Sequence, residues 1–119
     1  MFERDLDRML KPYPPAMAAL FRKLVALVRD IRPDFTCKVS EAWQTVNFHL
    51  PKRGFIMAIY GSRGDKVLLV FQDGRLLDHP LLTDDGKVKK VRWIPFAAGD
   101  KIDVDDIAIL IAEAVALRS

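Results

Sequence analysis

The chain has 119 residues, half of them hydrophobic, and a formal net charge of +3 from 19 basic and 16 acidic residues. This length suits a single domain spanning residues 1–119, and the apolar content excludes a disordered tail. The one cysteine, Cys37, excludes an intrachain disulfide, and no signal core or apolar run near ~20 residues is present, so we expect a cytoplasmic protein without a membrane partner.

Two helices are predicted at the start of the chain. Residues 2–10 place apolar side chains at helical spacing, and the prolines within residues 11–15 end this short helix because proline fixes φ and removes a donor. Pro14 and Pro15 also suit the first turn of the next helix. That helix is amphipathic and ends at Arg32-Pro33, and its apolar stripe comprises Met17, Leu20, Phe21, Leu24, Val25, Leu27, Val28 and Ile31.

Residues 36–94 change to a period of two, which is typical of β-strands. Residues 45–50 alternate apolar and polar side chains, and Trp43 is assigned to a strand as well. Turns at 51–54, 61–65 and 72–75 bound strands at 55–60 and 66–71, and a last strand covers residues 88–94. Short turns between successive strands predict antiparallel pairing.

The last predicted helix begins after Asp103, an N-cap residue, and extends to about residue 117. Asp105 and Asp106 lie in its first turn, where the helix dipole favours acids. Its buried stripe is predicted to comprise Val104, Ile107, Leu110, Ile111, Ala114 and Val115. The elements together predict a two-layer α+β domain, with an antiparallel sheet of about four or five strands and the N-terminal and C-terminal helices packed on one face.

Several segments follow one another in an order that resembles the YdhG-like family of small bacterial domains, also called domain of unknown function 1801. They are Ile31-Arg32-Pro33-Asp34, a strand with Trp43, Thr45-Val46-Asn47-Phe48, Val67-Leu68-Leu69-Val70-Phe71, Gly74-Arg75-Leu76-Leu77-Asp78, the turn Asp85-Gly86-Lys87, a basic strand with Lys90 and Arg92, and Asp103-Val104-Asp105-Asp106. The resemblance covers roughly residues 14–117. The family commonly has Trp-Gly followed by a proline two residues later, where this chain has Gln44 and Val46. The resemblance implies the YdhG-like α+β fold and, because some members have been proposed as frataxin-like iron carriers, a possible role in iron transfer.

Candidate metal ligands and nucleophiles are scattered along the chain. The histidines His49 and His79 form no closely spaced ligand pair, so surface positions are the simpler interpretation. Iron also binds carboxylates, but helix capping explains most of the acids near the last helix, which are Asp100, Asp103, Asp105, Asp106 and Glu113. Cys37 would act as a nucleophile only if His49 or Lys38 activated it, and a small core residue is the simpler interpretation. These residues favour a binding domain over an enzyme, and they identify no cofactor.

The segment 87–94 is strongly basic. An edge strand protected by lysines is the simpler interpretation. The alternative is an anion site in which Lys90 and Arg92, together with Arg53 and Arg63 from neighbouring turns, hold a carboxylate or phosphate.

The two tryptophans are either core residues or the walls of a pocket between sheet and helices, with Asn47 and Arg92 as its polar groups. We predict that a small anionic ligand binds in a cleft, and that this cleft is formed by Trp43, Asn47, Lys90, Arg92 and Trp93. One alternative is an iron carrier that uses His49, His79 or the acids of the last helix. Another is a homodimer formed through the edge strand at 87–94. Nucleic acid is a weaker option, because the basic residues are spread along the chain.

Overall fold

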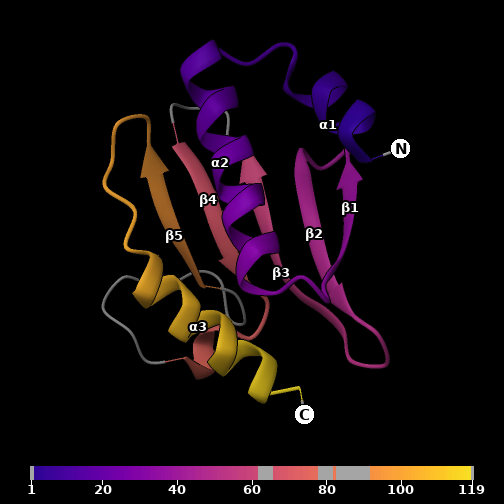
Figure 1. Cartoon of the computed structure of the whole chain (residues 1–119), viewed down its shortest axis with the longest axis vertical. Coiled ribbons are helices and arrows are strands. Elements are labelled where there is room, and N and C mark those ends of the chain that lie inside the picture. The colour runs from indigo at the N-terminus through magenta and orange to yellow at the C-terminus, as the bar shows by residue number, and fades with distance from the viewer. Residues whose placement is uncertain (1, 62–65, 78–81, 83–91, 119) are drawn as a thin grey trace.

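The computed structural model describes residues 2–61, 66–77, 82 and 92–118, and its elements are shown in Figure 1. The chain begins with two helices and continues with strands before it ends in a third helix. In order, the elements are α1 (Phe2–Leu10), α2 (Pro15–Ile31), β1 (Thr36–Ser40), β2 (Thr45–Leu50), β3 (Gly54–Gly61), β4 (Lys66–Phe71), the short 3-10 helix η1 (Gly74–Leu76), β5 (Arg92–Ala97) and α3 (Val104–Ala116).

The five strands form one antiparallel sheet in the order β1-β2-β3-β4-β5, so each strand pairs with its neighbour in the sequence. In Figure 1, α2 crosses in front of the sheet, α3 lies on the same side near the lower end, and α1 lies beside β1 and β2 at the top. This arrangement confirms the predicted α+β domain with its helices on one face. None of the described helices combines the length and the apolar composition needed to cross a membrane.

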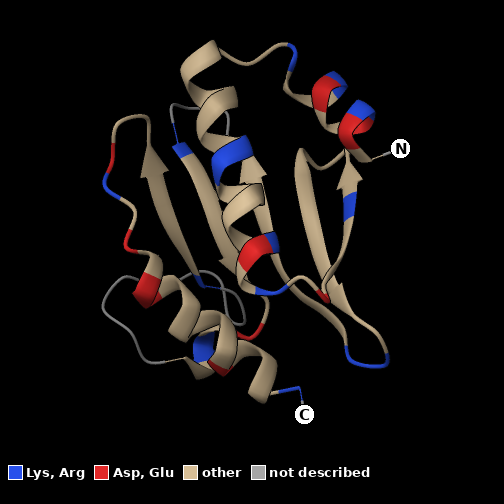
Figure 2. Ribbon diagram, viewed as in Figure 1, with Lys and Arg blue, Asp and Glu red and all other residues tan. Residues whose placement is uncertain are grey.

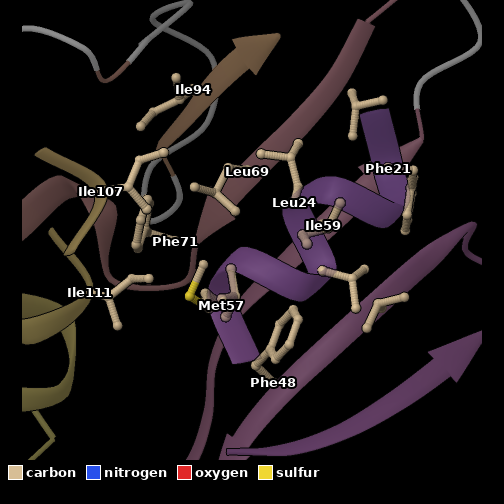
Figure 3. Close-up of a cluster of buried hydrophobic side chains, with 14 of the residues drawn as sticks. Phe21, Leu24, Phe48, Met57, Ile59, Leu69, Phe71, Ile94, Ile107 and Ile111 are labelled. Carbon is tan, nitrogen blue, oxygen red and sulfur yellow. The ribbon is translucent and has the colours of Figure 1, made fainter. Parts of the chain in front are cut away.

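The sheet has two different faces because side chains alternate along each strand. We call the face under the helices the covered face and the opposite one the open face. On β2, Val46, Phe48 and Leu50 are buried on the covered face, whereas the residues between them are only half-buried. Figure 3 shows how side chains from β2 to β5 meet those of α2 and α3 in one apolar cluster, which includes Phe48, Met57, Leu69, Phe71, Leu24 and Ile107.

The helices begin where the sequence predicts. Pro15 is in the first turn of α2, where backbone N–H groups have no acceptor within the helix, so the N–H that proline lacks costs no hydrogen bond. At α3, the Asp103 side chain accepts a hydrogen bond of 3.0 Å from the backbone N–H of Asp106, as expected for an N-cap. The predicted burial of Val104 is wrong: its side chain is exposed because it precedes the first residue of the stripe that contacts the sheet.

Two strand predictions also need correction. Trp43 is not on a strand but in the turn that joins β1 to β2. The last strand was predicted at 88–94, and the described strand β5 instead extends from Arg92 to Ala97, because Phe96 continues the buried alternation past Pro95. Residues 88–91 lie outside the described part of the chain.

Candidate binding site on the open face of the sheet

The open face is apolar over its last three strands. Antiparallel sheets usually alternate apolar residues inward with polar residues outward. Strands β1 and β2 follow this rule, since Thr36, Lys38, Thr45 and Asn47 point to the open face. On β3 to β5 the outward positions are mostly apolar, and they hold Phe55, Ala58, Tyr60, Leu68, Val70, Trp93 and Pro95.

The charged side chains that the described strands place on the open face are lysines. None of the described strands contains an aspartate or glutamate, whereas Lys38 on β1 and Lys66 on β4 occupy outward positions. Figure 2 shows the same distribution, with the acidic residues confined to helices and loops. A ligand that rests on this face therefore meets lysines and no carboxylate from the strands.

A shallow hollow of about 380 Å³ lies on this face, and its lining includes Ala58. Cross-strand register places Lys38, Asn47, Ala58, Val70 and Trp93 in one row across the sheet. Because alanine has the smallest side chain in this row, it leaves space between its larger neighbours. The hollow is lined by Trp43, Thr45, Asn47, Phe55, Ala58, Tyr60 and Val70.

The turn that holds Trp43 is fixed by hydrogen bonds from several directions. The hydroxyl of Tyr13 donates to Gln44 Oε1 over 2.5 Å, and the N–H of Gly61 donates to the carbonyl of Gln44 over 3.0 Å. The side-chain amide of Gln44 donates to the carbonyl of Glu41 over 2.6 Å, and Arg8 forms an ion pair with the Glu41 carboxylate. Trp43 is nevertheless 76% exposed. The turn is thus ordered, while its largest apolar side chain projects from it.

The backbone is unusual in this turn and at the end of the neighbouring strand β3. Gln44 has a φ of 57°, a left-handed conformation that glycine adopts more readily than residues with a side chain. At Gly61, an added Cβ would lie 2.3 Å from the Tyr13 hydroxyl, so only glycine allows the ring of Tyr13 to approach this closely.

A second hollow, also about 380 Å³, adjoins the first at the end of the sheet. Both are lined by Trp43, Thr45 and Tyr60, and the second adds Tyr13 and Gln44. We refer to the two hollows together as the Trp43 cleft. Thr45 lines both hollows, but its hydroxyl oxygen is itself buried and has no hydrogen-bond partner among the described residues. Because this oxygen is closed off from solvent, it is not a contact for a ligand in the cleft.

Two titratable groups lie where the helical layer meets the strands. Burial raises the pKa of the Tyr13 phenol above its ordinary value, and the nearby Tyr60 raises it further. Burial also raises the pKa of the Cys37 thiol, an effect that Arg29 partly opposes. Both groups therefore stay protonated at neutral pH. Tyr13 is a hydrogen-bond donor to the turn, and Cys37 is a poor nucleophile because the thiolate is the reactive form.

The structure brings two of the five predicted site residues together. Trp43 and Asn47 both line the hollow on the open face. Trp93 lies on the same face, paired with Val70, but outside the lining of the hollow. Arg92 starts β5 opposite Phe71 on the covered face, where the backbone of Gly74 packs against it. Lys90 lies outside the described residues. The cleft is therefore on the opposite side of the sheet from the predicted pocket between sheet and helices.

The other candidate groups are separated by the fold. Cys37 points to the covered face, whereas Lys38 and His49 point to the open face, so neither is placed to activate the thiol. His49 lies beside Phe55, with ring centroids 5.5 Å apart. Within the described residues, no three side chains of His, Cys, Asp or Glu lie close enough to hold a metal ion. His79 and Arg63 lie outside the described part. Arg53, in the turn between β2 and β3, is separated from β5 by β4.

Sequence reasoning missed Thr45, Phe55, Ala58, Tyr60 and Val70 as residues that line the hollow on the open face. One signal was available, because the segment 55–60 is apolar at successive positions and therefore apolar on both faces of a strand. No protein-family model, curated protein or solved structure matches the chain. Its function must be inferred from the side chains of the cleft.

Proposed function

We propose that this chain is a small non-enzymatic binding domain that holds a small anionic ligand in the Trp43 cleft. The observation that supports this most strongly is Trp43 itself. Its indole is 76% exposed on a turn that is held by hydrogen bonds from Tyr13 and Gly61. A single exposed apolar side chain is common on protein surfaces, but this indole lines both hollows beside Tyr60, so a ligand in the cleft would cover it.

The cleft has the composition of a small-molecule site. Ligand pockets are mainly apolar, with a few polar groups that fix orientation, and they have volumes upward of about 300 Å³. Here Phe55, Tyr60 and Trp43 provide the apolar walls, and Asn47 provides a polar group. The proposal is for binding alone, since no nucleophile in the described residues is placed beside a base at the cleft.

Lys38 is the cation that we assign to the ligand. It is exposed and lies directly across from Asn47 in the register of β1 and β2. Side chains directly opposite each other on antiparallel strands have Cβ atoms about 5 Å apart, so a group bound at Asn47 is within reach of the ammonium. Arg92 was the cation predicted from the sequence. It lies on the covered face, on the other side of the sheet from the cleft.

A thermal-shift screen against small carboxylates and phosphates tests the proposal, because a ligand that binds the native state raises its melting temperature by mass action. We expect anions to stabilise the wild-type protein and the Arg92→Gln variant, and to lose most of their effect on Lys38→Gln. If no anion stabilises the protein, or if Lys38→Gln responds like the wild type, the proposal is wrong.

A homodimer is the second candidate, and the apolar open face favours it. A second copy would bury the side chains that β3 to β5 present to solvent. Light scattering at high protein concentration distinguishes it, because a monomeric mass excludes a stable dimer. The iron-carrier role has no such support within the described residues, where no cluster of metal ligands occurs. We retain membership of the YdhG-like family as a proposal that the order of helices and strands supports.

A further inference from the structure

A groove lies on the helical side of the sheet, between residues 16–30 of α2 and the segment 98–104, and we call it the α2 groove. Figure 1 shows this segment leading from the end of β5 to the start of α3. Two hollows of about 530 and 370 Å³ form the groove, and both are lined by Lys23, Asp100 and Ile102. The Trp43 cleft lies on the other side of the sheet, so the groove is a separate surface.

The larger hollow has an apolar centre. Leu27 and Ile102 are half-buried there, and Val104 is 47% exposed. Val104 begins the apolar pattern of α3 in the sequence, yet the chain leaves it in contact with water. A partner seated in the groove would remove these three side chains from water, and the burial of apolar surface is the dominant favourable contribution to most protein association.

The charged residues of α2 form two sets on its two sides. Arg22 and Arg29 each form an ion pair with an acid of α1. Lys23 and Asp30 instead line the groove, are exposed, and form no ion pair with a described residue. Because they are seven residues apart, they lie on the same side of the helix but about 10 Å apart along its axis, too far to pair with each other. The groove thus offers one charge of each sign to a partner.

A second copy of α2 that lies antiparallel to the first matches these two charges. In a two-fold interface, residue i of one copy contacts residue j of the other, and residue j contacts residue i. With the axis beside Ala26 and Leu27, Lys23 of each copy faces Asp30 of the other, and two ion pairs form at once. An axis beside Lys23 would instead place the two ammonium groups opposite each other. The charges therefore favour one orientation and one register.

The lining of the larger hollow is also balanced in charge, as suits a surface that meets itself. It contains Lys23 and Lys101 together with Asp30 and Asp100. A strongly acidic or strongly basic partner would meet like charges here, whereas a second copy brings both signs in equal number. We propose that the chain forms a homodimer through the α2 groove, in which the two copies of α2 pack antiparallel about a two-fold axis beside Ala26. Apolar burial supplies the affinity, and the charges fix the orientation.

This homodimer leaves the open face accessible, because the α2 groove and the Trp43 cleft lie on opposite sides of the sheet. It therefore differs from the open-face homodimer considered above. It also does not depend on the anion site, since a dimer through α2 has two free clefts whether or not a ligand fills them.

The mass of the protein in solution tests the proposal, and sedimentation velocity from micromolar to millimolar concentrations measures it. We expect the mass to approach twice the 13.5 kDa of the chain as the concentration rises. Lys23→Glu and Asp30→Lys should each raise the dissociation constant of the dimer about tenfold or more, because each brings two pairs of like charges together. An equimolar mixture of the two variants should restore the dimer, since each altered side chain then faces an opposite charge.

Matched controls separate this surface from others. Lys38→Glu reverses a charge on the open face and should leave the dissociation constant unchanged. Val104→Glu should raise it about tenfold, because a carboxylate enters the apolar centre of the interface. Ile109→Glu on the same helix should not, since Ile109 is 51% exposed but lines neither hollow of the groove. Circular dichroism confirms that each variant is folded.

A monomeric mass over the whole concentration range would show that the proposal is wrong. A dimer that both Lys23→Glu and Asp30→Lys retain, or that Lys38→Glu disrupts, would place the interface elsewhere and overturn the inference. If the two variants are monomeric both separately and when mixed, the antiparallel register is wrong. None of these results bears on the stabilisation by anions, which is measured separately, so the two proposals can fail independently.

Discussion

The covered and open faces of the sheet are built from the same strands, yet their apolar residues have different explanations. On the covered face, Phe48, Leu69 and Phe71 are fully buried under α2 and α3, and the burial of apolar area accounts for them. On the open face, Tyr60 and Val70 are only half-buried, and no described helix covers them. Folding therefore explains the first set, while the second set is where we propose that a ligand binds.

The largest expected effect comes from removing a ring from each face. Phe48→Ala should lower the free energy of unfolding by about 3–5 kcal/mol, because the cavity on the covered face stays surrounded by packed side chains. Phe55→Ala on the open face should cost about 1 kcal/mol or less, because its ring is already in contact with water. Urea denaturation with unchanged m-values measures both. Equal losses would show that the two faces contribute alike to the core.

The next largest effect concerns the close contact between Gly61 and Tyr13. Gly61→Ala places a methyl group 2.3 Å from the Tyr13 hydroxyl, so the ring must move and release Gln44. We expect a loss of about 1–3 kcal/mol, as for other overpacked positions, and a shift in Trp43 emission. In the background Tyr13→Ala, the same substitution should cost little, because the clashing ring is absent. An additive double variant would contradict this explanation.

The sequence predicted the covered face well, for physical reasons. Its helices have a 3.6-residue period and β2 has a period of two, and both patterns arise from burial on one side. Val46, Phe48 and Leu50 therefore identified the inward positions of β2 without a structure. Asp103 was identified as an N-cap because capping depends only on neighbouring residues.

The site was harder to predict, because it depends on which residues lie opposite each other across strands. Asn47 and Ala58 meet only through the register of β2 and β3, and that register includes a bulge after Phe48. Trp43 was wrongly predicted to lie on a strand. Its turn is fixed by a hydrogen bond from Tyr13, which is 31 residues from Gln44, so the neighbouring sequence does not reveal it. Arg92 was assigned to the site by its charge. The segment 87–94 does not alternate regularly between apolar and polar residues, so the sequence did not show that Arg92 lies on the covered face.

A smaller effect tests how much the N-cap of α3 contributes to stability on the covered face. Asp103→Ala should lower the free energy of unfolding by about 1 kcal/mol, because the hydrogen bond that its carboxylate accepts from the N–H of Asp106 is lost. Asp105→Ala is a matched control in the same first turn, and it should cost only about 0.3 kcal/mol through the helix dipole. Thermal unfolding monitored by circular dichroism gives both values. If the control loses as much as Asp103→Ala, the first-turn charge and not the cap is responsible.

The smallest effect is a pH dependence at Tyr13, which lies where the helical layer meets the turn of the open face. Burial raises the pKa of its phenol, so the folded state favours the neutral form. The resulting stability is fully present below about pH 10, the ordinary tyrosine pKa, and it is lost as the pH rises through the higher folded-state pKa. Tyr13→Phe should therefore show a shallower fall in stability between about pH 9.5 and 11 than the wild type, while lysine titration, common to both proteins, cancels in the comparison. Trp43 emission of the wild type should change as the pH rises through the higher folded-state pKa, because the phenolate no longer donates to Gln44. Identical slopes for the two proteins would mean that the bond from Tyr13 does not couple the helical layer to the turn that presents Trp43.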